Sequence, residues 1–384
     1  MKKPSPKIYL YGAAACVVAA MALGYYYLFS SFTHHDSTEY VYIDRDDNID
    51  SVFAKLRPIG SHHGMSGFIT LARHNDFGSK IKTGRYAVNP DEGAFTLYRR
   101  IKNGQQSALQ LTIPEARTMQ RLSALLARKL MVDSAEIAKA LTDNIYLNKY
   151  GYDTATVSAL FIPNTYEVYW NMSIDNLMER MVKEHNAFWT AERKQKADAM
   201  GMSLVEVATL ASIIDEETAN NGEKPMIAGM YLNRLKTNMP LQADPTIKFA
   251  LKDFALRRIY HKQLKVESPY NTYVNTGLPP GPIKVASVAG IDAVLNHVEH
   301  NYLYMCAKED FSGTHNFART YTEHLANAAR YTKAFGLKKT SRIKAFVFRF
   351  ISVPAKWIMT ARQYVLNIYT ENRAYAKPFK TGFG

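Results

Sequence analysis

The sequence predicts an α+β protein with one N-terminal membrane-spanning helix, and three observations support this prediction. An uncharged, mostly apolar run of 23 residues lies near the N-terminus. A region with short alternating segments follows it. Beyond that lies a longer region of amphipathic helices, separated by loops rich in Gly, Pro and Asn. With 384 residues, the chain is long enough for two or three modules.

The apolar run, residues 8–30, is long enough to cross a hydrocarbon core of about 30 Å as a helix. Lys2, Lys3 and Lys7 precede it and place the N-terminus, residues 1–7, in the cytoplasm. We favour an uncleaved single-pass anchor. A cleaved signal peptide and lipidation at Cys16 are the alternatives.

In each case the chain from residue 33 onward lies outside the cytoplasm, in the periplasm. This location excludes nucleic acid as a partner, although the formal net charge is +14. The two cysteines, Cys16 and Cys306, give neither a disulfide framework nor a metal-ligand pattern.

Residues 33–110 are predicted to form a small α/β module. The segment 40–46 alternates like a strand, and a short helix that ends at Pro58 and Gly60 follows it. Residues 84–106 are typical of a strand, a turn and an amphipathic helix. Residues 111–335 are predicted to form a mixed α/β domain. No internal repeat of 20 to 50 residues is visible in the sequence.

The final segment, residues 336–384, forms a basic tail. It contains ten Lys or Arg residues against one acid, Glu371, so it supplies most of the chain's positive charge. Aromatic and aliphatic residues alternate with these charges, which favours an amphipathic segment attracted to anionic lipid. A solvated extension is the equally weighted alternative.

The segment 204–220 predicts a helix that carries three consecutive acids, Asp215, Glu216 and Glu217. Because a helix advances about 100° per residue, Glu216 is expected to face solvent, and the other two acids lie on opposite edges of the apolar stripe. Glu217 stacks above Leu210, Ile213 and Ile214. Apolar neighbours remove water from a carboxyl group, which raises its pKa and lets it act as a general acid. A helix end with solvated acids is the plainer alternative.

Two loops carry residues suited to carbohydrate. One is LQADPT, residues 241–246, and the other is SPYNTYVNTGLPPGPI, residues 268–283. Aromatic rings stack on sugar faces while amides and hydroxyls bond sugar hydroxyls. The candidate sugar-binding residues are Gln242, Asp244, Thr246, Tyr270, Asn271 and Tyr273. Stabilisation of the loops themselves is the alternative for each of them.

The motifs ASIIDEET, NRL, LQADPT, YNTY, GLPPGPI and THNF, in this order, resemble the endolytic murein transglycosylase family (MltG/YceG-like). The resemblance spans roughly residues 33–332. It implies that the module 33–110 is LysM-like and that 111–335 is a catalytic domain with a helix-borne glutamate. The family's motif usually has two glutamates separated by one residue. Here the first is Asp215 and the second, which the resemblance makes catalytic, is Glu217.

Membership implies cleavage of the MurNAc-β-1,4-GlcNAc bond of nascent peptidoglycan strands to give 1,6-anhydroMurNAc ends, which would terminate strand elongation. It also implies an inner-membrane protein whose partners are glycan strands and, as candidates, peptidoglycan synthases. Asp215 and Glu217 point to different sides, so a single acid/base fits better than a pair of carboxylates across the bond. We expect no metal and no cofactor, since no histidines have H-E-x-x-H spacing.

Two other functions stay open at this point. One is a non-catalytic peptidoglycan-binding scaffold of the cell-wall elongation machinery. The other is a hydrolase that leaves reducing ends.

Overall fold

The computed structural model describes residues 6–75, 77–256, 258–334, 355–360 and 363–368. The chain divides into two compact units. The first comprises Met1–Glu217 and Pro240–Asn296, and the second comprises Thr218–Met239 and His297–Gly384. The secondary structure is a mixture of helices and short two-stranded sheets, as expected of an α+β protein.

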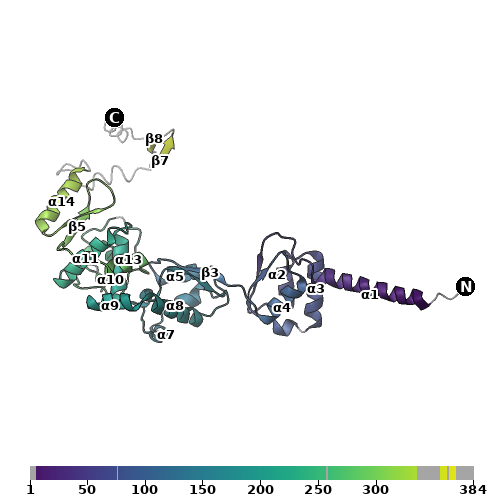
Figure 1. Ribbon diagram of the computed structural model, residues 1–384. Coiled ribbons are helices and arrows are strands. Elements are labelled where there is room, and N and C mark those ends of the chain that lie inside the picture. The colour runs from purple at the N-terminus through teal and green to yellow at the C-terminus, as the bar shows by residue number, and fades with distance from the viewer. Residues whose placement is uncertain (1–5, 76, 257, 335–354, 361–362, 369–384) are drawn as a thin grey trace. The chain divides into compact units, whose positions relative to one another are not determined.

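The first element is the helix α1 (Pro6–Leu28), shown in purple in Figure 1. Within it, Tyr9–Leu28 is long and apolar enough to cross a membrane. Its exposed side chains are almost all apolar, which in water would be a large unfavourable surface. The helix therefore meets the length and composition requirements of the predicted anchor.

The module that follows is built on a hairpin of distant strands. Strand β1 (Glu39–Ile43) pairs antiparallel with β2 (Gly84–Val88), and the helices α2 (Ile49–Leu56) and α3 (His62–His74) lie between them in the chain. A short 3-10 turn, η1 (Phe77–Lys80), precedes β2, and α4 (Ala94–Asn103) follows it. The core of the module contains buried residues from every one of these elements, including Phe68, Phe77, Tyr86 and Leu97. The structure agrees with a small α/β module here, and its LysM-like character stays a prediction.

The same arrangement recurs in the next stretch of the chain. Strand β3 (Leu109–Ile113) pairs antiparallel with β4 (Asn164–Val168). Between these strands lie α5 (Met119–Leu126), α6 (Ser134–Ala140), α7 (Asn144–Asn148) and the 3-10 turn η2 (Val157–Leu160). The helix α8 (Ile174–Phe188) follows β4. We call residues 39–103 the upstream repeat and residues 109–188 the downstream repeat.

The two repeats agree in detail. Val41 pairs with Tyr86 upstream, and Leu111 pairs with Tyr166 downstream, at the same register position. Each tyrosine is buried and donates its hydroxyl to a carbonyl four residues earlier, that of Lys82 or Ile162, at 2.8 Å.

The helix after each hairpin also carries an arginine at the equivalent place. Arg100 donates to the carbonyl of Ala87 at 2.7 Å, and Arg180 donates to that of Glu167 at 3.1 Å. The chain therefore contains a duplicated unit. Equivalent residues of the two copies, such as Tyr86 and Tyr166, are more than 50 residues apart, so a search for repeats of 20 to 50 residues does not reveal it.

The rest of the first unit carries the acidic helix. The helices α9 (Ala191–Ala199) and α10 (Leu204–Glu217) come first, and the part that returns after the second unit's segment contains α12 (Asp244–Ala250), the 3-10 turn η3 (Gln263–Lys265) and α13 (Val288–Leu295). Helix α10 packs against α12, α13 and η2. The backbone N–H of Val285 donates to the carbonyl of Ala116 at 2.9 Å, which joins this part to the downstream repeat.

The second unit is organised around α11 (Lys224–Lys236), with strands β5 (Tyr304–Ala307) and β6 (His315–Ala318) paired antiparallel and followed by α14 (Tyr321–Ala334). In the NRL motif, Asn233 donates to the carbonyls of His300 and Tyr302, and Arg234 donates to that of Leu303. This motif therefore fastens the segment before β5 to α11.

Strands β7 (Ala355–Thr360) and β8 (Gln363–Ile368) form an antiparallel hairpin within the basic tail. The remainder of residues 336–384 lies outside the described residues. Attraction of the tail to lipid therefore stays a prediction.

Candidate active site

Helix α10 is fixed at its first turn by a capping box. The Ser203 hydroxyl accepts from the N–H of Glu206, and the Glu206 carboxylate accepts from the N–H of Ser203 at 2.7 Å. All residues from Val207 to Ile214 are buried, so the helix runs through the core of the unit. A buried helix of this kind holds the side chains at its end in a defined place.

Asp215 is tied to the start of another helix. Its carboxylate accepts from both the N–H and the hydroxyl of Ser287, each at 2.7 Å. Ser287 is the N-cap of α13 and accepts from the N–H of Gly290 at 2.8 Å. A Cβ added at Gly290 would lie 2.6 Å from a carboxylate oxygen of Asp215, so a larger residue there would displace this side chain. Asp215 therefore fastens α13 to α10.

Glu216 does not face solvent, so that prediction was wrong. Its side chain is only 15% exposed, and Arg117 donates to it twice, at 3.0 and 2.7 Å. The ammonium of Lys284 lies 3.5 Å from the same carboxylate and 2.8 Å from Glu115. The helical periodicity placed Glu216 correctly on the face opposite the apolar stripe. That face is covered, however, by the two segments that carry Arg117 and Lys284, which are distant in sequence.

Glu217 is the last residue of α10 and is half-buried. The three apolar residues expected beneath it, Leu210, Ile213 and Ile214, have no exposed surface. Glu217 therefore lies at the negative end of the helix dipole, with buried apolar residues one turn before it.

The two candidate sugar-binding loops lie together. The N–H groups of Gln242 and Ala243 donate to the carbonyl and hydroxyl of Thr272, at 2.9 and 3.1 Å. The hydroxyl of Tyr273 donates to Asp244. Because α12 begins at Asp244 and packs on α10, both loops are positioned by the helix that carries Glu217.

The six candidate residues fall into two groups by exposure. Gln242 and Asp244 are exposed, and Tyr270 and Tyr273 are half-buried. Gln242 also has a left-handed backbone with φ of 51°, which is uncommon for a residue other than glycine and is frequent at functional sites.

Thr246 and Asn271 have no exposed surface. The Thr246 hydroxyl bonds to the carbonyl of Ala243 and the hydroxyl of Thr272. The Asn271 amide donates to the carbonyls of Leu264 and Val266, each at 2.9 Å, and accepts from the N–H of Tyr273. Full burial leaves these two side chains no surface for direct contact with a ligand, so we revise their role to support of the loops.

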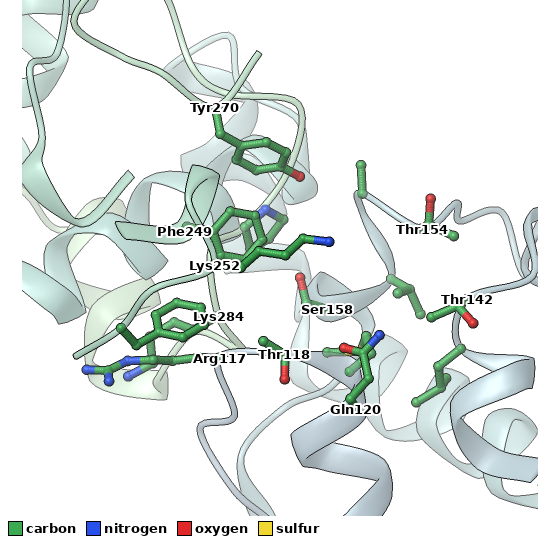
Figure 2. A pocket seen from close by; sticks show the side chains of 16 residues that line it. Arg117, Thr118, Gln120, Thr142, Thr154, Ser158, Phe249, Lys252, Tyr270 and Lys284 are labelled. Atoms are coloured by element: carbon green, nitrogen blue, oxygen red, sulfur yellow. The ribbon is translucent and has the colours of Figure 1, made fainter. Parts of the chain in front are cut away.

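A cleft of about 450 Å³ lies beside this site, between the downstream repeat and the loops after α12 (Figure 2). Arg117 and Lys284, the partners of Glu216, line it, and so does Tyr270. The Tyr270 ring packs on Phe249 with centroids 4.7 Å apart, and burial raises the pKa of its hydroxyl to about 12. Glu217 itself is not among the lining residues, so the cleft extends the site beyond the catalytic candidate.

The sequence profile of the YceG-like family matches residues 41–330. The chain belongs to the YceG-like family. A crystal structure of a YceG-like protein from Listeria monocytogenes is similar, with 26% sequence identity and a TM-score of 0.50, and the match covers 76% of this chain and 99% of that one.

Two curated relatives of this YceG-like chain carry the name endolytic murein transglycosylase. The protein from Bacillus subtilis (strain 168) is 29% identical over 272 residues, which are 66% of this chain and 74% of the relative. The protein from Streptococcus pneumoniae serotype 2 (strain D39 / NCTC 7466) is 23% identical over 363 residues, which are 83% of this chain and 64% of the relative. The suspected family is thereby confirmed.

The acidic helix end is held in place by three residues that the sequence did not indicate: Arg117, Lys284 and Ser287. Lys284 directly follows the GLPPGPI motif, which is the one local signal for its position. Within the residues that the structure describes, no three His, Cys, Asp or Glu side chains cluster as metal ligands do.

Proposed function

We propose that this YceG-like protein is a lytic transglycosylase that cleaves the MurNAc-β-1,4-GlcNAc bond within nascent peptidoglycan strands. Its family and the names of two relatives support this activity. The observation that carries the choice of residue is the position of Glu217: it is half-buried at the end of α10, directly after the buried residues Ile213 and Ile214. Asp215 binds Ser287 and Glu216 binds Arg117. Glu217, which the family resemblance also makes catalytic, is the proposed acid/base.

In the proposed reaction, Glu217 first donates its proton to the glycosidic oxygen, and the bond from that oxygen to the muramic C1 breaks. The resulting carboxylate then accepts the proton of the muramic 6-hydroxyl as O6 forms a bond to C1. The products are a 4-hydroxyl end and a 1,6-anhydroMurNAc end, and no water is consumed. Because the substrate supplies the nucleophile, a second carboxylate across the bond is not required.

The loops beside α12 supply the proposed sugar contacts. Gln242 and Asp244 are exposed and polar, and Tyr270 and Tyr273 offer ring faces with hydroxyl groups. This combination suits sugar rings and their hydroxyls. The hydrogen bond from Tyr273 to Asp244 fixes both side chains relative to each other.

The apolar helix α1 supports a single-pass anchor in the inner membrane, with the N-terminus in the cytoplasm and the catalytic domain in the periplasm. Held there, the enzyme would meet strands as synthases extend them, and each cut would end the elongation of a strand. Peptidoglycan synthases are therefore the proposed partners.

The test is an analysis of product ends. The full chain, kept in detergent, is incubated with uncrosslinked glycan strands, and the new ends are identified by mass spectrometry. Anhydro ends support the proposal. Reducing ends would indicate a hydrolase instead, and intact strands under all conditions would indicate a non-catalytic scaffold.

A further inference from the structure

The cleft beside the candidate active site has two walls of different origin. One wall comes from the downstream repeat, mainly its connection from α6 to β4, residues 141–163. This connection is longer than its counterpart between α3 and β2 in the upstream repeat. The opposite wall comes from α12 and the segment after it, with Phe249, Phe254 and Tyr270. The extension in the second copy of the unit therefore supplies part of this cleft.

The two walls approach each other closely where the backbone at Gly281 contacts that at Ala155. A Cβ added at Gly281 would lie 2.0 Å from the carbonyl oxygen of Ala155, which lines the cleft. The N–H of Ile283 donates to the buried hydroxyl of Ser212 on α10 at 3.0 Å. The cleft is thus built on the same helix that ends at Glu217.

The charged residues among the sixteen that line the cleft are all basic, namely Arg117, Lys252 and Lys284. Arg117 and Lys284 pair with Glu216. In the part of the chain that the structure describes, no carboxylate lies within ion-pair distance of the Lys252 ammonium, and Figure 2 shows this side chain extending toward the wall that carries Thr154 and Ser158. Lys284 also pairs with Glu115, and the Asp153 carboxylate acts on the Tyr270 hydroxyl. Of the three lining cations, Lys252 is therefore the one available to an anionic group of a ligand.

The backbone fixes where the Lys252 side chain begins. The N–H of Lys252 donates to the carbonyl of Phe249 at 3.0 Å, and its left-handed φ of 54° is the conformation in which helices such as α12 commonly end.

The uncharged residues that line the cleft indicate what the rest of the ligand should be like. Aromatic rings face a wall that carries the hydroxyls of Thr118, Thr142, Thr154 and Ser158. Such a surface suits a molecule with both apolar faces and hydrogen-bonding groups. In a peptidoglycan strand the sugar rings are uncharged, and the carboxylates belong to the peptide attached to the lactyl group of muramic acid.

We propose that this cleft binds the acidic stem peptide of the strand, with Lys252 pairing with a peptide carboxylate. The inference rests on the proposed function and adds to it that peptide-bearing strands are preferred over strands without peptides.

The test measures binding without cleavage. The full-length Glu217→Gln chain in detergent is titrated calorimetrically with two probes: uncrosslinked glycan oligosaccharides with intact peptides, and the same oligosaccharides after amidase removal of the peptides. We expect the peptide-bearing probe to bind about three- to tenfold more tightly, as for a partly desolvated charge pair, and to lose this advantage at high salt.

A second substitution at Lys252 assigns the preference. Lys252→Gln should abolish it, Lys252→Arg should retain most of it, and Lys194→Gln, at an exposed lysine on α9, should leave it unchanged. Equal binding of both probes to the Glu217→Gln chain would overturn this inference alone. A preference that survives in Lys252→Gln would also overturn it. Binding of neither probe would overturn the proposed function as well.

Discussion

Arg117 donates two hydrogen bonds to Glu216, at 3.0 and 2.7 Å, although the two residues are 99 positions apart in the sequence. The contact joins the segment after β3 to the last turn of the helix that carries Glu217. The contact places a cation beside three consecutive carboxylates at the negative end of a helix. Repulsion between the carboxylates and the helix dipole both destabilise negative charge there, and the cation offsets part of this effect.

Replacement of Arg117 should destabilise this helix end. Arg117→Gln removes the paired hydrogen bonds, and because Arg117 is 48% exposed we expect a loss of only about 0.5–1.5 kcal/mol of unfolding free energy. The apparent Tm of the full chain in detergent measures the change. Arg121→Gln, at an exposed arginine on α5, is the control. Equal Tm values for the two variants would show that the pair has no structural importance.

Asp215 should prove structural. Asp215→Ala leaves the N–H of Ser287 without its carboxylate and should cost about 1–3 kcal/mol of stability. Cleavage activity at a temperature where the variant is folded should fall far less than in Glu217→Gln. Denaturant unfolding and product analysis on the same sample separate these effects. A variant that is fully stable but inactive would show that Asp215 takes part in the chemistry.

Gly281 should tolerate no side chain. In Gly281→Ala the new methyl group meets the carbonyl of Ala155 at 2.0 Å, and because both groups are backbone or Cβ, the two cleft walls must separate. We expect a loss of roughly 1–3 kcal/mol or more, as for an overpacked core. Gly78→Ala, where the nearest atom is 4.0 Å away, should be close to neutral. A Tm for Gly281→Ala equal to that of the parent would contradict the close contact.

His185 should make stability depend on pH. Burial lowers its pKa below the usual 6.5, and Lys194 lowers it further. In the unfolded chain the imidazole gains its proton as the pH falls through about 6.5, whereas in the folded chain it does so at lower pH, so stability decreases as the pH falls below that value. His185→Gln should flatten the fall in Tm between pH 6.5 and pH 5, and His261→Gln, at an exposed histidine, should not. Identical pH profiles for His185→Gln and the parent would rule out this contribution.

The sequence predicted the parts of the fold that depend on local pattern. The apolar N-terminal helix, the strand expected at 40–46, the strand and helix expected within 84–106, and the helix before Glu217 all follow from periodicity within a few turns. The two candidate loops were also expected in one site, and the structure joins them through Thr272.

What the sequence could not show depends on contacts between distant segments. Glu216 was expected in solvent because nothing near it in sequence indicates Arg117 or Lys284. The duplication was not seen because its signature is only a sparse set of equivalent residues, such as Tyr86 with Tyr166 and Arg100 with Arg180, within otherwise different sequences. Burial of Thr246 and Asn271 likewise depends on how the loops fold against one another.

The central claim is that one carboxyl group, Glu217, performs the chemistry. The most direct measurement is mass spectrometry of the ends formed from uncrosslinked glycan strands by the full chain and by Glu217→Gln, with Glu179→Gln on the exposed face of α8 as the control. We predict 1,6-anhydroMurNAc ends with the parent and the control, and a loss of at least about 100-fold in Glu217→Gln at an unchanged Tm, as for removal of a general acid. Anhydro ends formed at the parental rate by folded Glu217→Gln would contradict the account.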